Sequence, residues 1–295
     1  MLFRSYFVAR LDWPLFIQSL KKANIYQLLV STLLVLLSLT IRSFRWHLVC
    51  CASSKQFKNF WHAGNLGYLG NLVLPARAGE VLRIQQIKKA SNMPLSQLII
   101  GSLIDRVSDV LTISIVILLI ISGVISGHID SRISLFGQLT LWAILFTFVA
   151  LYLTTRSRRT KIRIKKLIPH LLLQKLTQSK EAFTKELVNK TVCSIVLISP
   201  IVFVIDFGAL WLTLHAMKHF LPFTAAIVTT IGLMIGSIIP STPGQIGIFQ
   251  AAFVISLALY NVGETEAIAV AVIFQTICII ATTLVGTYSF LAWKR

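Results

Sequence analysis

The sequence predicts an all-α polytopic membrane protein, built as an inverted repeat of span, re-entrant hairpin and span joined by one connector helix. Three observations lead to this fold class. Of the 295 residues, 56% are hydrophobic and 13% are charged, with a mean hydropathy of +0.79, whereas about a quarter of the residues in a soluble domain are charged. Several apolar runs are about 20 residues long, enough to cross a bilayer. Two proline–glycine interruptions also recur at one fixed offset.

The two interruptions follow the same pattern. Pro75-x-x-x-Gly79 in the first half corresponds to Pro240-x-x-x-Gly244 in the second, and both 240 − 75 and 244 − 79 equal 165. The same offset relates the flanking spans, 25–49 to 190–214 and 98–126 to 263–291. Broken backbone at membrane depth is tolerated only where protein buries it or where it lines a wet cavity. Paired broken helices in inverted repeats are typical of transporters, with the binding site at the repeat interface.

In chain order, the elements form two repeats around a connector. Residues 1–24 are read as a short or partial N-terminal helix, because charged residues and a proline interrupt the apolar run. The first repeat covers 25–126 and holds a hairpin at about 58–90; each arm is too short to cross the bilayer comfortably, which predicts re-entry. The remaining elements are a connector span at 135–154, a basic segment at 155–190, and a second repeat at 191–293 with its hairpin at about 222–260. Within the repeats, the full spans are expected at 25–49, 96–126, 191–217 and 266–293.

The distribution of positive charge orients the chain in the membrane. The formal net charge is +18, and residues 155–190 contain eleven Lys and Arg against two Glu. The positive-inside rule places this segment in the cytoplasm, so the C-terminus is cytoplasmic and the two hairpins enter from opposite faces. The segment could be a topogenic loop, an amphipathic helix on the inner leaflet or a surface that docks a partner. No zinc-finger or RNA-binding motif points to nucleic acid.

Charged residues inside the expected membrane region form the candidate site. Asp105 and Asp109 are four residues apart and share a helix face, with Arg106 beside them. Ionised groups at this depth are costly and need partners, and Arg77, Arg83 and Glu80 of the first hairpin are the natural ones. The arginines could hold a lipid phosphate, since a guanidinium binds phosphate oxygens bidentately; alternatively, the charges form an internal network that only ties hairpin to span.

The complete candidate set comprises substrate-binding residues and helix breaks. Free backbone N–H groups at the hairpin tips attract anions, and the hydroxyls there either donate to the ligand or only cap the broken helix. The candidate substrate-binding residues are Arg42, Arg45, Asn71, Arg77, Glu80, Arg83, Asp105, Arg106, Asp109, Ser241, Thr242 and Gln245. The hairpin breaks are Pro75, Gly79, Pro240, Pro243 and Gly244.

Three further features have mainly structural interpretations. Asp206 lies within an expected span, where it is either an ion or proton relay or a structural residue that pairs with backbone freed near Pro200 or with Arg42, and the structural interpretation is favoured. Gly232 and Gly236 form a GxxxG pair that predicts close helix packing within the fold. His215 and His219 share a helix face, but no third ligand lies nearby in the sequence, so no metal site is expected.

Several of these segments carry a family resemblance. They are Arg45-Trp46, Asn71 with Leu74-Pro75-Ala76-Arg77-Ala78-Gly79-Glu80 and Arg83, Asp105-Arg106 with Asp109, and Pro240 with Pro243-Gly244, Gly247 and Phe249. The chain resembles the lysylphosphatidylglycerol synthase transmembrane family, also called flippase-like membrane proteins, from about residue 10 onward. The resemblance implies an integral membrane domain that moves lipids or lipid-linked sugars between leaflets.

The chain also departs from the family's pattern. No aminoacyl-transferase domain follows Arg295, so a free-standing member without aminoacylation is expected. The family typically has Gly and Glu where this chain has Gln245 and Gln250, which puts a proton-coupled role of the second hairpin in doubt. Asp105 replaces a glutamate that is common in the family, which is a conservative change.

The resulting expectation is a flippase-like transporter that moves a phosphate-bearing lipid, phospholipid or isoprenoid- or glycan-linked, between leaflets of a prokaryotic inner (plasma) membrane. Its partners would be membrane lipids, anionic ones foremost, and neither enzymatic activity nor a cofactor or metal is expected. The alternative is a non-transporting scaffold subunit for a glycosyltransferase or envelope-lipid enzyme, docked through 155–190. A membrane-embedded transferase acting on lipid phosphate is disfavoured, because no general-base or metal constellation is evident.

Overall fold

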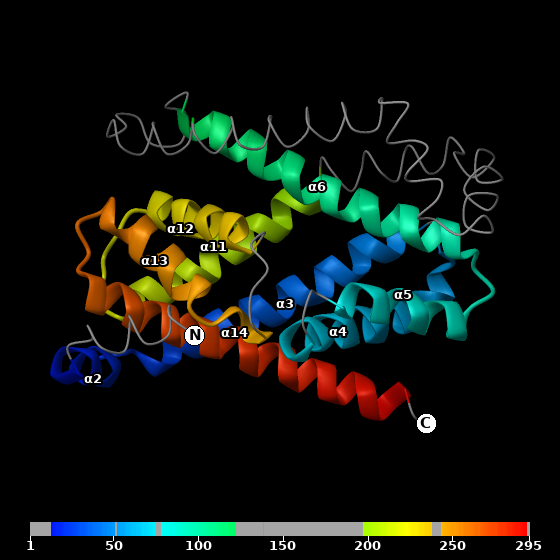
Figure 1. Ribbon diagram of the computed structural model, residues 1–295, viewed down its shortest axis with the longest axis horizontal. Helices are drawn as coiled ribbons and strands as arrows, with labels where there is room; N and C mark the ends of the chain where they lie inside the picture. The colour runs from blue at the N-terminus through cyan, green and yellow to red at the C-terminus, as the bar shows by residue number, and fades with distance from the viewer. Residues whose placement is uncertain are drawn as a thin grey trace, which may run out of the picture. The chain divides into compact units, whose positions relative to one another are not determined.

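The computed structural model describes residues 13–50, 52–74, 78–121, 138, 197–237 and 243–293. The regular structure in these residues is helical, without strands (Figure 1). The chain divides into two compact units: Met1–Phe44, Lys55–Ala90 and Ile201–Arg295 form unit 1, and Arg45–Ser54 with Ser91–Pro200 form unit 2. The predicted connector at 135–154, apart from residue 138, and the basic segment at 155–190 lie outside the described residues.

Three of the described helices are long and apolar enough to cross a membrane. They are α3 (Ile25–Val49), α11 (Ser199–Ala216) and α14 (Glu264–Trp293), at the positions expected for spans at 25–49, 191–217 and 266–293. Helix α6 (Leu95–Ile121) has the length of a span, but three charged residues near its middle set it apart from these three. The short α2 (Trp13–Lys21) precedes α3. These helices support an integral membrane protein.

The first interruption separates α4 (Phe57–Val73) from α5 (Gly79–Ala90), and the two helices pack against each other (Figure 1). At 1.5 Å per residue they are about 26 and 18 Å long, both shorter than the roughly 30 Å hydrocarbon core. Their contact depends on glycine: a Cβ on Gly79 would lie 1.9 Å from the carbonyl oxygen of Gly67. The backbones of α4 and α5 therefore touch directly.

The second interruption separates α12 (Phe223–Gly236) from α13 (Ile248–Ala258), with the short 3-10 helix η5 (Pro243–Gln245) before α13. Helices α12 and α13 pack together. A Cβ on Gly232 would lie 2.5 Å from the hydroxyl of Ser256, and one on Gly236 would lie 2.9 Å from a methyl of Ile248. The GxxxG pair thus faces α13 within the fold, which confirms the prediction.

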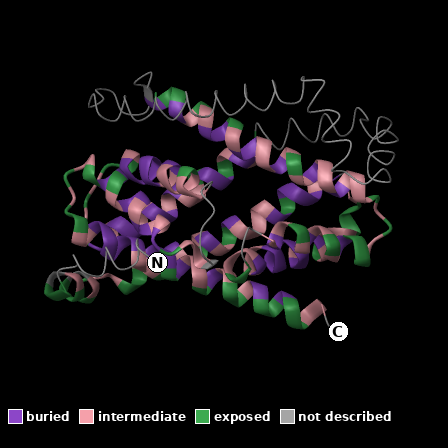
Figure 2. Cartoon of the chain, viewed as in Figure 1, coloured by how far each residue is buried: buried purple, intermediate pink, exposed green. Residues whose placement is uncertain are grey.

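Helix α14 connects both helix pairs within unit 1. It packs against α4 and against α13, and α4 also packs against η5 of the second interruption. The apolar core of the unit is built from buried residues of α3, α11, α12, α13 and α14, the purple positions of these helices in Figure 2. The two interrupted pairs therefore share one central helix, α14, whereas the apolar core includes the second pair only.

Candidate functional site

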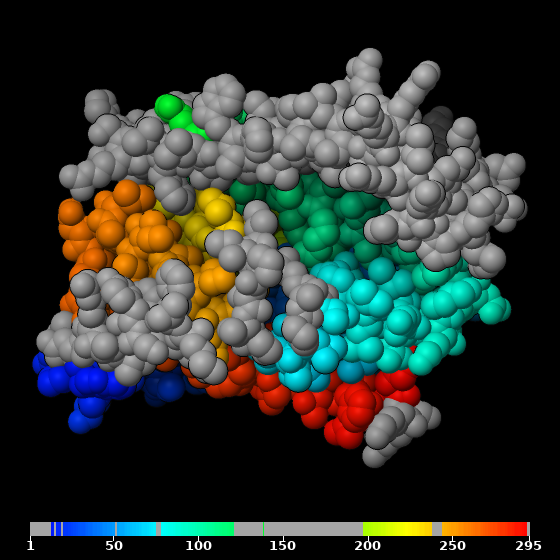
Figure 3. Space-filling view, in the orientation of Figure 1, coloured from blue at the N-terminus to red at the C-terminus, as the bar shows by residue number. Residues whose placement is uncertain are grey.

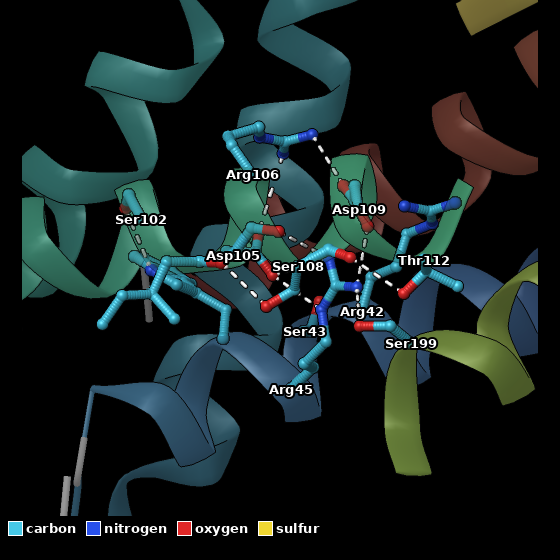
Figure 4. A network of polar contacts seen from close by, with 12 residues as sticks. Arg42, Ser43, Arg45, Ser102, Asp105, Arg106, Ser108, Asp109, Thr112 and Ser199 are labelled. Atoms are coloured by element: carbon cyan, nitrogen blue, oxygen red, sulfur yellow. Dashed lines mark hydrogen bonds and ion pairs between the residues drawn. The ribbon is translucent and has the colours of Figure 1, made fainter. Parts of the chain in front are cut away.

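In unit 2, Arg45 lies at the centre of a buried ion cluster (Figure 4). Its guanidinium is 2.7 Å from a carboxylate oxygen of Asp105 and 2.7 Å from one of Asp109, and it donates a 2.8 Å hydrogen bond to the hydroxyl of Ser199. The side chains of Arg45, Asp105 and Asp109 are 1%, 1% and 5% exposed. Arg106 adds longer contacts of 3.7 and 3.4 Å to the same carboxylates. Asp105 and Asp109 share a helix face, as predicted, and both form ion pairs with Arg45.

These carboxylates have a partner that the sequence did not indicate. The sequence pointed to residues of the first hairpin, of which Arg77 lies outside the described residues; the structure pairs both carboxylates with Arg45 at the end of α3, and Arg83 forms a 2.7 Å ion pair with Glu80 of its own helix. The reason is local: α6 packs its Gly101 against Cys50, just beyond α3, and Trp46 donates to the hydroxyl of Ser102 at 3.0 Å. This contact carries Arg45 onto the acidic face of α6.

In unit 1, Arg42 and Asp206 form an ion pair between α3 and α11. Asp206 also accepts a hydrogen bond from the hydroxyl of Ser38, and the Nε of Arg42 donates to that hydroxyl at 3.3 Å. The guanidinium lies 5.8 Å from the ring centroid of Phe203, within cation–π range. Of the two structural partners considered for Asp206, freed backbone and Arg42, the structure shows Arg42.

Helices α4 and α5, the first helix pair, contain the second ion pair of unit 1, Glu80–Arg83, and several unpaired polar atoms. Arg83 is 3% exposed and Glu80 is 29% exposed, so the pair reaches from the packed interface toward the surface that α4 and α5 form in cyan in Figure 3. Within the described residues, the buried side-chain amide of Asn65 and the Oδ1 of Asn71 have no hydrogen-bond partner. Buried polar atoms almost always have partners, so these amides can accept a polar ligand or water.

The second interruption is held by a chain of neutral amides. The N–H of Gly247 donates to Oε1 of Gln250 at 2.7 Å, Nε2 of Gln250 donates to Oε1 of Gln275 at 2.7 Å, and Nε2 of Gln275 donates to the carbonyl of Gly244 at 2.7 Å. Gln245 adopts a left-handed backbone with φ 55°, between Gly244 at 74° and Gly247 at 98°. The family's usual glycine at this position suits that backbone.

The predicted site residues thus fall into four groups and an undescribed set. One group is the Arg45 cluster, a second is the Arg42–Asp206 pair, a third is the first helix pair with Asn71, Glu80 and Arg83, and the fourth is Gln245 in the second interruption. The four described arginines and their four carboxylate partners sum to a formal charge of zero, without Arg77, which is not described: Arg42, Arg45, Arg83 and Arg106 against Glu80, Asp105, Asp109 and Asp206. Outside the described residues lie Pro75, Arg77, Pro240, Ser241 and Thr242.

Sequence reasoning missed four residues that shape these sites, namely Ser38, Ser199, Gln250 as a bonding partner, and Gln275. The amide of Gln275 in the apolar run of α14 was the available signal, because polar residues in membrane spans usually have a specific partner. Serines in apolar helices are too common to stand out. In the described part of the chain, no group of three His, Cys, Asp or Glu is placed to hold a metal ion.

Long apolar helices, broken helix pairs and intramembrane ion pairs together define an integral membrane protein of the helical class. The family model for the lysylphosphatidylglycerol synthase TM region matches residues 1–286, and the chain belongs to this family. Comparison with curated proteins and with solved structures gives no match. The family makes this a membrane protein of the lipid-related, flippase-like kind.

Proposed function

We propose that this protein moves a phosphate-bearing lipid between the two leaflets of a prokaryotic inner membrane and is not itself an enzyme. The observation that carries the proposal is the placement of two arginine ion pairs, each with a partly exposed carboxylate, in the unit that contains both broken helix pairs: Arg42–Asp206, with both side chains partly exposed, and Glu80–Arg83, with Glu80 partly exposed and Arg83 buried. Guanidinium groups suit phosphate oxygens, and membership in a lipid-related family supports a lipid as the phosphate carrier.

The proposed transport path follows the two helix pairs as re-entrant hairpins of an inverted repeat. Both pairs are built from helices shorter than the hydrocarbon core, and α4 packs against η5, so the first pair meets the second interruption. Loops entering from opposite faces and meeting midway would give a headgroup a polar route across the membrane. The amide of Asn65 and the Oδ1 of Asn71, which have no hydrogen-bond partner among the described residues, lie on α4 beside this route. With this topology, 155–190 and the C-terminus are cytoplasmic.

In this function the Arg45 cluster has a structural role. Its arginine and two aspartates are nearly inaccessible and satisfy one another, so a headgroup could reach them only by breaking a buried ion pair. Removing one partner of such a pair costs about 3–5 kcal/mol. The cluster therefore fastens the end of α3 to α6, a stapling role of the kind that the sequence left open for hairpin and span.

Leaflet sidedness in proteoliposomes tests the proposal. Purified protein is reconstituted with fluorescent phosphatidylglycerol or an isoprenyl phosphate, and a membrane-impermeant quencher reports the lipid exposed outside, with and without an imposed ion gradient. Wild-type protein should expose inner-leaflet lipid, Arg83→Gln should not, and Thr276→Ala, at an exposed position of α14, should match wild type. Unchanged sidedness of both lipids under every gradient would refute transport.

The basic segment at 155–190 supports a second candidate, a scaffold subunit for a glycosyltransferase or envelope-lipid enzyme. Eleven cationic residues in 36 are more than topology needs and suit an acidic partner surface. Replacing half of these residues with glutamine should release a co-purifying enzyme while leaving lipid movement intact. If lipid movement is lost and no partner is released, the segment serves the carrier itself.

A further inference from the structure

The Arg42–Asp206 pair differs from the Arg45 cluster in accessibility. Its side chains are 19% and 22% exposed, against 1%, 1% and 5% for Arg45, Asp105 and Asp109. Both partners lie inside helices long and apolar enough to span the membrane, Arg42 in α3 and Asp206 near the middle of α11. An accessible ion pair at such a position is expensive to keep and is usually functional.

The contacts of Arg42 describe an anion site that an internal anion already fills. Its guanidinium faces the carboxylate of Asp206 on one side and the ring of Phe203 on another, while its Nε donates to the hydroxyl of Ser38. A carboxylate oxygen and a phosphate oxygen make the same charge-assisted hydrogen bond to a guanidinium. The position of the Asp206 carboxylate is therefore one that a lipid phosphate could occupy.

We propose that Asp206 is a displaceable counter-ion, which holds Arg42 while the site is empty and gives way to the phosphate of an anionic lipid headgroup. This inference rests on the proposed function and deepens it by naming the residue that competes with the substrate. Exchange keeps the Arg42 guanidinium paired with an anion in both states, so the arginine is never left without a counter-ion. The displaced carboxylate keeps the hydroxyl of Ser38 as a hydrogen-bond donor and, being partly exposed, regains water.

Two substitutions separate a competing anion from a structural partner. Asp206→Asn keeps the shape of the side chain and an acceptor for Ser38 but removes the competing charge. Asp206→Glu keeps the charge. If Asp206 competes with the headgroup, Asp206→Asn should bind lipid phosphate more tightly than wild type, and Asp206→Glu should bind close to wild type. If Asp206 is only a structural partner of Arg42, Asp206→Asn should change the free energy of unfolding without lowering the Kd for the lipid.

The experiment measures binding of short-chain phosphatidylglycerol to the full-length protein in detergent micelles, with inorganic phosphate as a second ligand. We expect Asp206→Asn to lower the Kd for phosphatidylglycerol about tenfold, Asp206→Glu to stay near wild type, and Arg42→Lys, which keeps charge but loses the planar fork, to weaken binding. Gly208→Ala, whose added Cβ would meet only Leu34 at 3.8 Å, is the matched control in α11.

Inorganic phosphate should bind more weakly than the lipid but show the same order among variants. An unchanged Kd for phosphatidylglycerol in Asp206→Asn, or an effect confined to free phosphate, would overturn the inference. If Asp206→Asn does not fold, Arg42→Lys decides: undiminished lipid binding would overturn the inference. These outcomes are distinguishable from failure of the proposed function, because wild-type protein could still move lipid between leaflets while none of these variants changes binding.

Discussion

The two interrupted helix pairs share one sequence pattern and differ in what holds them together. In α4 and α5 the backbones touch, with Gly79 against the carbonyl of Gly67, and a buried charge, Arg83, lies in the interface. In α12 and α13 side chains separate the backbones, with Ser256 and Ile248 facing the glycines of α12, and neutral amides hold the loop. A proline and a glycine at the same spacing therefore mark the break without fixing its chemistry.

Because they are held together differently, we interpret the two helix pairs as having different roles. The first pair is polar, and the Glu80 carboxylate of its ion pair is partly exposed while Arg83 is buried. The second is apolar, with Phe249 stacked on Phe253 at 5.4 Å and both near Phe274. We interpret the first pair as the part that contacts substrate and the second as the part that frames it.

The largest expected effect breaks the backbone contact of the first pair. In Gly79→Ala the new methyl would lie 1.9 Å from the oxygen of Gly67 and 2.6 Å from the N–H nitrogen of Asn71, and neither backbone atom can rotate away. We expect a loss of more than about 3 kcal/mol in the free energy of unfolding, measured by denaturation in micelles. Near-wild-type stability would show that α4 and α5 are further apart.

Removing the hydrogen bonds that the Gln275 amide makes in the second pair should have the next largest effect on the free energy of unfolding. Gln275→Leu leaves the carbonyl of Gly244 and the Nε2 of Gln250 without these bonds, which should cost about 1–3 kcal/mol. Thr276→Ala is the control on the same helix, since its hydroxyl bonds only the carbonyl of Val272 on an exposed face. Equal stability of the two variants would argue against these hydrogen bonds.

A matched glycine substitution in the second pair should cost less than the one in the first. The added Cβ of Gly236→Ala would lie 2.9 Å from a methyl of Ile248, and an Ile side chain can shift. We expect a loss of about 1 kcal/mol, clearly smaller than for Gly79→Ala under the same denaturant. A larger loss for Gly236→Ala than for Gly79→Ala would contradict the closer backbone contact that we assign to the first pair.

The smallest effect is a gain from relaxing the second loop. Gln245 has a left-handed φ of 55°, which is unfavourable for a residue with a Cβ. Gln245→Gly should therefore raise the free energy of unfolding by about 0.5–1 kcal/mol, detected as a higher unfolding midpoint. A lower midpoint would mean that the Gln245 side chain makes a stabilising contact that outweighs the backbone strain.

Local features of the sequence predicted the all-helical class, the long apolar helices and the two interruptions. The bounds of α3 follow from one apolar run between polar residues, and both interruptions follow from proline and glycine. Arg42 was one of two structural partners considered for Asp206. The partnership of Arg45 with Asp105 and Asp109 was not foreseen, because it depends on which helices pack, and the bond between Gln250 and Gln275 joins residues 25 apart.

Gly79 shows most clearly what could not be predicted from the local sequence, namely its contact with a neighbouring helix. Gly79 was identified as a helix breaker, whereas in the structure it is the first residue of α5, and its missing side chain admits the backbone of α4. Sequence alone does not reveal which backbone approaches a glycine, because the neighbour comes from another helix. The candidate site was therefore predicted in its residue types and only partly in its pairings.

The most direct test of the central claim is the rate of phosphatidylglycerol movement between leaflets for Arg83→Gln and Gln275→Leu, measured at a temperature where both variants remain folded. Arg83→Gln removes charge from the first pair, and Gln275→Leu loosens the frame of the second. We predict that Arg83→Gln loses at least tenfold in rate and that Gln275→Leu keeps most of it. Equal rates for Arg83→Gln and wild type, with a loss only in Gln275→Leu, would contradict the assignment of substrate contact to the first pair.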